Sequence, residues 1–435
     1  MGLWTAKGMG AATLAGTLLA AAQPAFADTT TDRISDLERK LERSLQVIEQ
    51  LTRKVEQLET ARTPVAPPPD APPPAGIEAR VSGLEQQVSA IGSRATTDDG
   101  LALHGFADVG LRASRPGNRR GAALGSVDLY LAPQFGSNVR SLIELVFETG
   151  EDGKIATDLE RLQLGYTFSD ALTTWLGRFH VPYGYWNTAF HHGAQIQTSI
   201  LRPRFLDFED RGGILPAHGV GLWATGKVGA GTGKLNYDAY VVNSPRISLE
   251  DPATPGTGVL DPNLAGATNH NALVGGKVGY DFGGRLQGLT LGVHGFAMKV
   301  EDDATPVLRS RVRMLGGYGT WLEDNWEVLG EYYRFSDRNL DGAGSSHGSW
   351  AGYLQAGYLF GRWTPYARVE RAALDQGDNY FAQQASGQSY DRGVIGLRFD
   401  IDARSAVKVE LNRTHFTDRA TAHVNEARFQ YAIRF

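Results

Sequence analysis

Hydrophobic residues recur every seven positions near the start of the chain. The two apolar positions of this repeat are occupied by Ile34, Leu41, Ile48 and Val55 and by Leu37, Ser44, Leu51 and Leu58. Seven of these eight residues are apolar, which predicts an α-helical coiled coil over residues 28–62. The branched residues at the first position favour two strands, whereas Leu45 and Val47 widen the apolar face and favour three. A single amphipathic helix lying on a domain is the alternative.

A proline-rich segment follows the heptads. Residues 63–76 include two triplets of proline, which enforce a polyproline II conformation and form a semi-rigid spacer. A second, shorter heptad run in residues 77–95 places Ile77, Val81, Leu84, Val88 and Ile91 at its apolar positions. The pattern predicts a linker and then a short second coiled-coil segment.

From Leu101 onward the period of the hydrophobic pattern changes to two. Val407 and Val409, for example, alternate with Lys408 and Glu410, and such alternation over about ten residues marks a strand that is apolar on one side and polar on the other. A soluble β-sandwich would alternate as well, but with shorter strands. We count sixteen strands, which begin near Leu101, Val127, Val139, Leu159, Leu172, Val220, Leu235, Ala272, Leu289, Leu308, Trp326, Trp350, Trp363, Asp391, Ala406 and Val424.

The connections between these strands alternate in length. Short turns are predicted at residues 136–138, 169–171, 231–233, 323–325, 361–362 and 402–405, and longer loops at residues 181–216, 244–271, 336–349 and 372–389. Short turns at one end and longer loops at the other are typical of outer-membrane barrels. We therefore predict an all-β transmembrane barrel of about 16 antiparallel strands over residues 96–435, with the coiled coil in front of it.

Composition agrees with such a barrel and narrows the possible functions. The chain has 53 glycines and 10 % aromatic residues, which suit many strands joined by tight turns. Its mean hydropathy is -0.27, and after the first thirty residues no apolar run approaches the roughly 18 residues that a membrane helix needs. A net charge of -5 does not suggest the basic surface that nucleic-acid binding requires. Without cysteine, disulfides and thiolate metal sites are excluded.

Both ends of the sequence carry export features. Lys7, the apolar residues 9–22 and the small-x-small run 25–27 predict a signal peptide over residues 1–27. The last predicted strand has Phe429, Tyr431, Ile433 and Phe435 on its apolar side. This end resembles the assembly signal of Gram-negative outer-membrane proteins. We therefore expect the barrel in the outer membrane and the coiled coil in the periplasm.

The arrangement as a whole resembles the phosphate-selective porin family and its relatives with a periplasmic coiled coil. The resemblance rests on the heptads at residues 34–58, on the G-R-F-x-x-P-Y-G run that ends at Gly184, and on Phe435. Members of this family are trimeric sixteen-stranded channels, so the resemblance implies a homotrimer surrounded by outer-membrane lipid. It does not extend to a dense set of Lys and Arg residues that would argue for phosphate itself as the solute.

The third long loop, residues 181–216, is the predicted site of selectivity, because the corresponding loop of porins folds into the lumen. Its candidate constriction residues are His191, His192, Arg202, Arg204, Asp207, Glu209, Asp210 and Arg211. Opposite charges on the sides of a narrow, low-dielectric passage act strongly on a passing solute. The same charges could instead pair with one another and hold the loop, and the sequence leaves both interpretations open.

Charged residues also alternate along the predicted strands. Arg309, Arg311 and Arg313 are expected to face the lumen, because facing lipid would cost about 2–4 kcal/mol each near the midplane. Further charges on predicted luminal faces are Arg368, Arg392, Arg398, Arg428, Glu144, Glu148, Glu327, Glu370, Glu410 and Glu426. The lumen is therefore mixed in charge, and the arginine ladder slightly favours anions.

These features predict a passive, water-filled channel for small hydrophilic solutes, without a cofactor. Catalytic activity is not expected, since no residues combine as a convincing nucleophile, base and orienting group. A metal site at His191 and His192 with Asp207 or Glu209 is not predicted either, because adjacent histidines lack the i,i+4 spacing of helical ligands. The alternative is an envelope tether, in which the N-terminal helices reach out to contact peptidoglycan.

Overall fold

The structure, a computed structural model, describes residues 103–116, 120–149, 155–190, 193–211, 213–250, 254–263, 271–304, 306–342, 344–417 and 423–435. Its contacts divide the chain into two units, residues 1–94 and 95–435. All described residues belong to the second unit. The predicted signal peptide, coiled coil, linker and second heptad segment lie outside them and stay predictions, as does the peptidoglycan contact.

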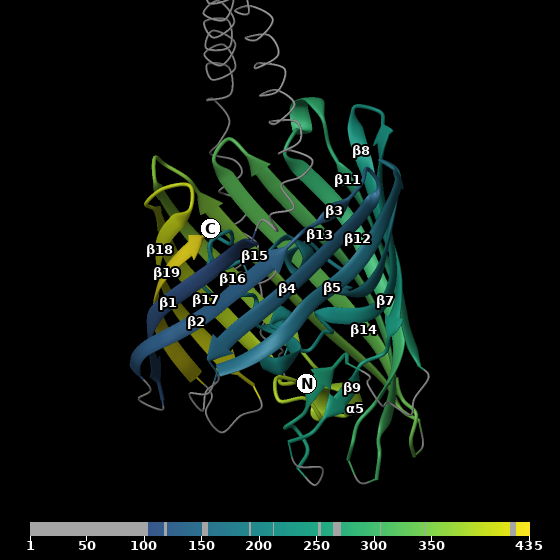
Figure 1. Cartoon of the computed structure of the whole chain (residues 1–435). Coiled ribbons are helices and arrows are strands. Elements are labelled where there is room, and N and C mark those ends of the chain that lie inside the picture. Colours follow the sequence, from purple (N-terminus) through teal and green to yellow (C-terminus); the bar gives the residue numbers. More distant parts are fainter. Residues whose placement is uncertain are drawn as a thin grey trace, which may run out of the picture. The chain divides into compact units, whose positions relative to one another are not determined.

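The described residues form a closed antiparallel β-barrel (Figure 1). Its strands are β1 (Leu103–Arg115), β2 (Arg120–Leu131), β4 (Val139–Thr149), β5 (Ile155–Ser169), β6 (Leu172–His180), β7 (His218–Ala230), β8 (Gly233–Asn243), β11 (Ala272–Asp281), β12 (Leu289–Glu301), β13 (Arg309–Glu323), β14 (Trp326–Asn339), β15 (Ser346–Tyr358), β16 (Trp363–Ala373), β17 (Tyr390–Asp400), β18 (Ser405–Phe416) and β19 (His423–Arg434). The two-residue β3 (Gln134–Phe135) extends the pairing of β2 with β4. The first strand, β1, pairs with both β2 and β19, which closes the barrel.

The prediction of sixteen antiparallel strands is confirmed in the described part of the chain. The largest disagreement in position is β2, which begins at Arg120 rather than near Val127. Residues 120–126 read RGAALGS, and this small, glycine-rich stretch has too few large apolar residues to show alternation. Its backbone nevertheless pairs with β1.

The two ends of the barrel differ in their connections. The short-turn end, where β19 finishes beside the start of β1, includes the turn at Asp324 and Asn325, whose φ angles of 50° and 68° make a two-residue hairpin. The opposite, long-loop end joins strands through longer segments such as 181–217, 244–271 and 374–389. The second of these contains the hairpin of β9 (Arg246–Ser248) and β10 (Val259–Asp261), and the third contains α5 (Asn379–Ala382). Figure 1 shows the C-terminus at the end opposite to β9 and α5.

The outer face of the barrel is rich in exposed hydrophobic side chains. Leu315, Val369 and Val293 are 68 %, 61 % and 60 % exposed, values that suit a surface in contact with lipid rather than water. Aromatic pairs such as Trp363 with Phe399, whose ring centroids lie 4.4 Å apart, occur near the short-turn end. Among the described residues, no helix is both long enough and apolar enough to cross a membrane.

The inner face departs from the simple polar pattern on one side of the barrel. Phe296, Met298, Val312, Met314 and Phe335 of β12–β14 point inward and are buried. They belong to one hydrophobic cluster with Phe205 and Leu206 of segment 181–217. A polar lumen would not bury them, so these positions show that the segment packs against this wall from inside the barrel.

Candidate functional site

Segment 181–217, here called the inward loop, connects β6 to β7 and folds into the barrel. It contains α4 (Trp186–Ala189) and two single 3₁₀ turns, η1 (Arg204–Leu206) and η2 (Glu209–Arg211). Its hydrogen bonds run to strands that are more than a hundred residues away in the sequence. The expectation that the third long loop narrows the lumen thus has a structural basis.

The start of the inward loop is bound by a buried carboxylate of β14. One oxygen of Glu331 accepts the backbone N–H of Trp186 at 2.8 Å and the hydroxyl of Tyr353 at 2.7 Å. The other oxygen accepts the N–H of Tyr185 at 3.0 Å and the hydroxyl of Tyr333 at 2.6 Å. Burial, with the charge of Glu327 and Glu331 nearby, raises the pKa of Tyr185 to about 12. Four donors on one carboxylate satisfy its lone pairs without water.

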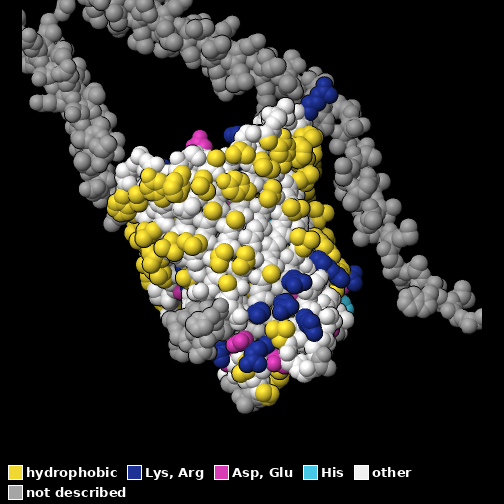
Figure 2. Space-filling model, turned by 90° about the vertical axis from the view of Figure 1, so that its right-hand side faces the viewer, with side chains coloured by type: hydrophobic (Ala, Val, Ile, Leu, Met, Phe, Trp, Pro, Cys, Tyr) yellow, Lys and Arg dark blue, Asp and Glu magenta, His cyan; other side chains and the backbone are white. Residues whose placement is uncertain are grey.

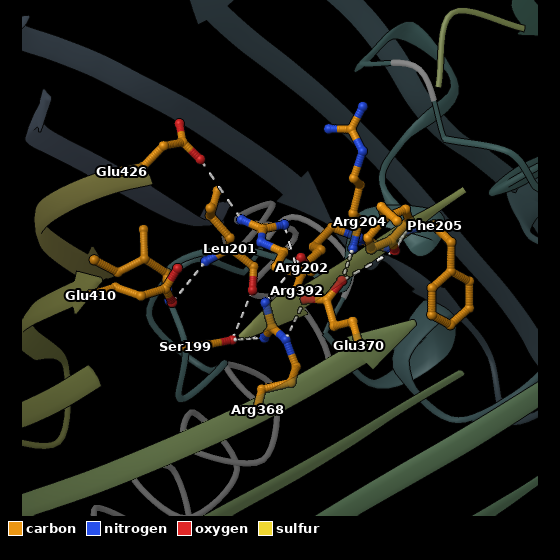
Figure 3. Close-up of polar contacts among 12 residues, drawn as sticks. Ser199, Leu201, Arg202, Arg204, Phe205, Arg368, Glu370, Arg392, Glu410 and Glu426 are labelled. Atoms are coloured by element: carbon orange, nitrogen blue, oxygen red, sulfur yellow. Dashed lines mark hydrogen bonds and ion pairs between the residues drawn. The ribbon is translucent and has the colours of Figure 1, made fainter. Parts of the chain in front are cut away.

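The middle of the inward loop is held by charged residues of β16 and β18 (Figure 3). Glu370 accepts the backbone N–H of Arg204 at 2.8 Å, and Glu410 accepts that of Ile200 at 2.8 Å. Arg368, itself paired with Glu370 at 2.8 Å, donates to the Ser199 hydroxyl at 2.9 Å. All three of these wall residues are almost fully buried. Charge-assisted hydrogen bonds of this kind are about twice as strong as neutral ones.

Two more cations hold the inward loop through its carbonyl oxygens. Lys408 of β18 donates to the carbonyls of Gln197 at 2.7 Å and Ser199 at 3.2 Å. Arg398 of β17 donates to the carbonyls of Gln195 at 2.7 Å and Gln197 at 3.0 Å. The wall therefore binds the loop backbone with carboxylates at its N–H groups and with cations at its carbonyls, which fixes the loop's position.

Two of the predicted constriction residues are internal supports of the loop. Arg202 is buried, lies with its guanidinium carbon 3.9 Å from the centroid of the Phe208 ring, and donates to the carbonyl of Leu206 at 2.8 Å. Burial lowers the pKa of Arg202, while Asp207 and other neighbouring groups act in the opposite direction. Glu209 accepts the backbone N–H of His218 at 2.6 Å, and their side chains meet at 3.0 Å. Neither residue faces open space.

The remaining predicted constriction residues differ from one another. Arg204 is partly exposed, with its guanidinium carbon 5.0 Å from the centroid of the Phe416 ring and a hydrogen bond to the Ser386 hydroxyl at 3.2 Å. Asp207 is partly buried and accepts the N–H of Phe208 at 3.1 Å. Arg211 is exposed and pairs with Glu148 of β4. His191, His192 and the side chain of Asp210 lie outside the part of the chain that the structure describes.

The prediction that Arg309, Arg311 and Arg313 face the lumen is wrong. The intervening residues of β13 at this end, Ser310, Val312 and Met314, are buried, so the three arginines share the outer face with Leu315. The lipid penalty that motivated the prediction applies near the midplane and falls to about 0–1 kcal/mol near the interfaces. These arginines occupy the long-loop end of their strand, and the inward loop turns the inner face apolar there.

The sequence did not indicate some residues that hold the loop, because their partners are distant in the chain. Glu331 and Lys408 occupy polar positions of strands in which polar and apolar residues alternate, as many other charged residues do. Nothing in their local sequence marks them as supports of the loop. A pocket of about 570 Å³ lies between the inward loop and the short turns, lined by Gln195, Arg362, Arg398 and Asp400 among others. Among the described residues, no group of three or more His, Asp or Glu side chains is placed to hold a metal ion.

Comparisons with known proteins identify the fold. No family model matches the chain, and no curated protein matches it. An anion-selective porin from Comamonas acidovorans is similar in structure, with a TM-score of 0.51, 12 % identity, and coverage of 77 % of this chain and 99 % of that one. In-vitro folded OmpT, an outer membrane protein of Vibrio cholerae, gives a TM-score of 0.50 at 11 % identity, covering 77 % of this chain and 96 % of its own.

The chain thus has the porin fold, a closed barrel of sixteen antiparallel strands. At this level of identity the likeness concerns architecture alone. Membership in the phosphate-selective porin family stays a prediction, since no family model matches.

Proposed function

We propose that the protein is an outer-membrane channel that lets small hydrophilic solutes pass by diffusion, without enzymatic chemistry. The observation that carries the proposal is the inward loop, which is tied to the far wall by Glu331, Glu370 and Glu410. The exterior of the barrel suits contact with lipid, and the fixed loop inside it narrows the lumen permanently. Such an arrangement lets solutes diffuse through without a conformational change. The long-loop end would then face the cell exterior and the short-turn end the periplasm.

The passage is proposed to lie beside the inward loop, along the luminal side chains that stay partly exposed. On β4 and β19, Glu148, Glu426 and Arg428 have side-chain exposures of 20 %, 21 % and 24 %. Charged groups that remain hydrated along a narrow passage act on solutes through their electric fields.

A modest preference for anions is proposed to depend on Arg204. Most arginines near the loop are matched by a carboxylate, as Arg211 is by Glu148 and Arg428 by Glu426. Arg204 instead contacts the Ser386 hydroxyl and two aromatic rings, with no ion pair to a carboxylate among the described residues. Its positive charge is therefore uncompensated locally and would concentrate anions, with a bias that salt screens.

The test is the reversal potential of single channels in planar bilayers under a salt gradient. Wild-type protein should conduct with a small anion preference, and Arg204→Gln should move the reversal potential toward cations. The matched control is Arg371→Gln, which removes the same charge from the outer face of β16. Absence of conductance in the wild-type protein would refute the proposal of a channel. Equal shifts of the reversal potential in the two variants would refute only the role of Arg204.

A homotrimer is also proposed. An outer groove of about 710 Å³ crosses β16–β19 and reaches β1 and β2, and small residues such as Ala113, Gly393 and Ala427 contribute to it. Small outward side chains allow another barrel to approach closely. Mass measurement in detergent by light scattering should give three copies, and a monomer at all concentrations would contradict the proposal.

A further inference from the structure

Five cations form a basic patch on the outer face of β12–β14, at the long-loop end: Lys299, Arg311, Arg313, Arg334 and Arg338. The residues between them, including Met298, Val312 and Phe335, are buried inside the barrel. The cations therefore continue the outer face that carries Val293 and Leu315 nearer the middle of the barrel. In Figure 2, dark blue side chains gather on the lower part of the wall, below a broad hydrophobic belt.

The strand register places three of these cations in one row. Lys299 is the partner of Arg311 across β12 and β13, and Arg311 is the partner of Arg338 across β13 and β14. Like charges at directly opposed positions destabilise a sheet. The row is therefore costly unless a negative charge lies over it.

The next row toward the loops is compensated within the protein. Arg309 pairs with Glu301 at 3.4 Å and with Asp341 at 3.3 Å. By contrast, none of the five patch cations has a carboxylate within ion-pair distance among the described residues. The difference between adjacent rows indicates that the negative partner of the patch comes from outside the chain.

Aromatic rings mark the level of the membrane surface beside the patch. Tyr332 and Trp350 stack on the outer face with centroids 5.9 Å apart, and Trp350 is the register partner of Arg334. Arg371 adds a guanidinium 5.7 Å from the Trp350 centroid. Such aromatic belts sit at the headgroup level. The patch begins at that level and extends toward the loops, where lipid phosphates would lie.

We propose that the basic patch binds the phosphate groups of anionic glycolipids in the outer leaflet. Arginine suits this partner because its guanidinium binds phosphate oxygens in a bidentate manner. Opposed cations from three strands present a surface that one multiply charged headgroup can span. The inference rests on the proposed outer-membrane location, but it does not depend on conductance.

The experiment measures binding of bis-phosphorylated lipid A to the purified full-length protein in detergent by native mass spectrometry. The test variant is Lys299→Gln/Arg311→Gln/Arg338→Gln. The matched control, Lys234→Gln/Arg285→Gln/Arg404→Gln, removes the same charge from exposed residues at the short-turn end. Wild type and control should bind alike, and the test variant should bind about tenfold more weakly or worse.

Two further arms make the outcome specific. Dephosphorylated lipid A should bind wild type as weakly as phosphorylated lipid A binds the test variant, and added salt should weaken only the phosphorylated ligand. Should the triple variant fail to fold, the milder Arg338→Gln, which leaves two cations of the row, is measured in its place against Arg404→Gln. Unchanged binding in the patch variants, or equal binding of the dephosphorylated lipid, would overturn the proposal even if the channel conducts normally.

Discussion

The luminal carboxylates Glu331, Glu370 and Glu410 of β14, β16 and β18 are buried beneath the inward loop, which makes this the covered side of the barrel. Glu148 of β4 and Glu426 and Arg428 of β19 stay partly exposed, and they define the open side. Glu331, Glu370 and Glu410 are no more than 4 % exposed and bind loop backbone. Glu426 and Arg428 keep side-chain exposures of 21 % and 24 %. Charged residues at the same alternating positions therefore bind the loop backbone on one side and stay partly exposed on the other.

The largest effect is expected from breaking a buried pair on the covered side. Glu370→Ala removes the partner of Arg368 and the acceptor for the Arg204 N–H, which should cost about 3–5 kcal/mol of stability. The inward loop should loosen, and single-channel current should become noisier. Denaturant unfolding and bilayer recording measure the two effects.

The control for that variant is Glu426→Ala on the open side. Because Glu426 is partly hydrated, its loss should change stability by less than about 1 kcal/mol. Equal destabilisation by the two variants would remove the distinction between the two sides.

A smaller loss is expected from Tyr353→Phe, which removes one of the hydroxyl donors to Glu331. A hydrogen bond to a charged group contributes about 1.5–3 kcal/mol, so the free energy of unfolding, measured by denaturant titration, should fall by that amount. Tyr332→Phe, on the outer face, is the matched control and should be nearly neutral. A neutral Tyr353→Phe would mean that Glu331 does not depend on this donor.

On the open side, Arg428→Gln should alter selectivity while leaving stability within about 0.5 kcal/mol. Its guanidinium lies 3.0 Å from Glu426, so removing it exposes a negative charge and should shift the reversal potential toward cations. Loss of folded protein without a shift would place Arg428 among the structural residues instead.

The smallest effect concerns pH at the long-loop end. A hydrogen bond from His347, and another from the Gly377 N–H, hold the pKa of Asp375 below its ordinary value of 3.8. A lowered folded-state pKa stabilises the protein above the unfolded value, and this contribution disappears as the pH falls through the folded value. The Tm difference between wild type and Asp375→Asn should therefore be small at pH 7 and should disappear once the pH has fallen below the lowered pKa of Asp375. A difference that persists there would exclude this ionisation as its cause.

The barrel was predictable from the sequence because strand alternation is a local signal, as in Val407 to Leu411. The position of the inward loop was predictable only through resemblance. The orientation of Arg309, Arg311 and Arg313 could not be predicted from the sequence. Val312 and Met314 point inward only because the inward loop supplies an apolar partner there. Local polarity cannot reveal such a partner. The roles of Arg202 and Glu209 as supports follow from the same long-range packing.

If Arg204 sets the anion preference, its side chain must border a water-filled passage inside the barrel, which we propose here. The chain has no cysteine, so Arg204→Cys carries a single thiol that a charged methanethiosulfonate reagent can modify during bilayer recording. Current through Arg204→Cys should change in discrete steps when the reagent is added. Arg371→Cys, on the outer face of β16, should conduct unchanged. Conductance that is insensitive to the reagent at position 204, or equally sensitive at both positions, would show that Arg204 does not border the passage.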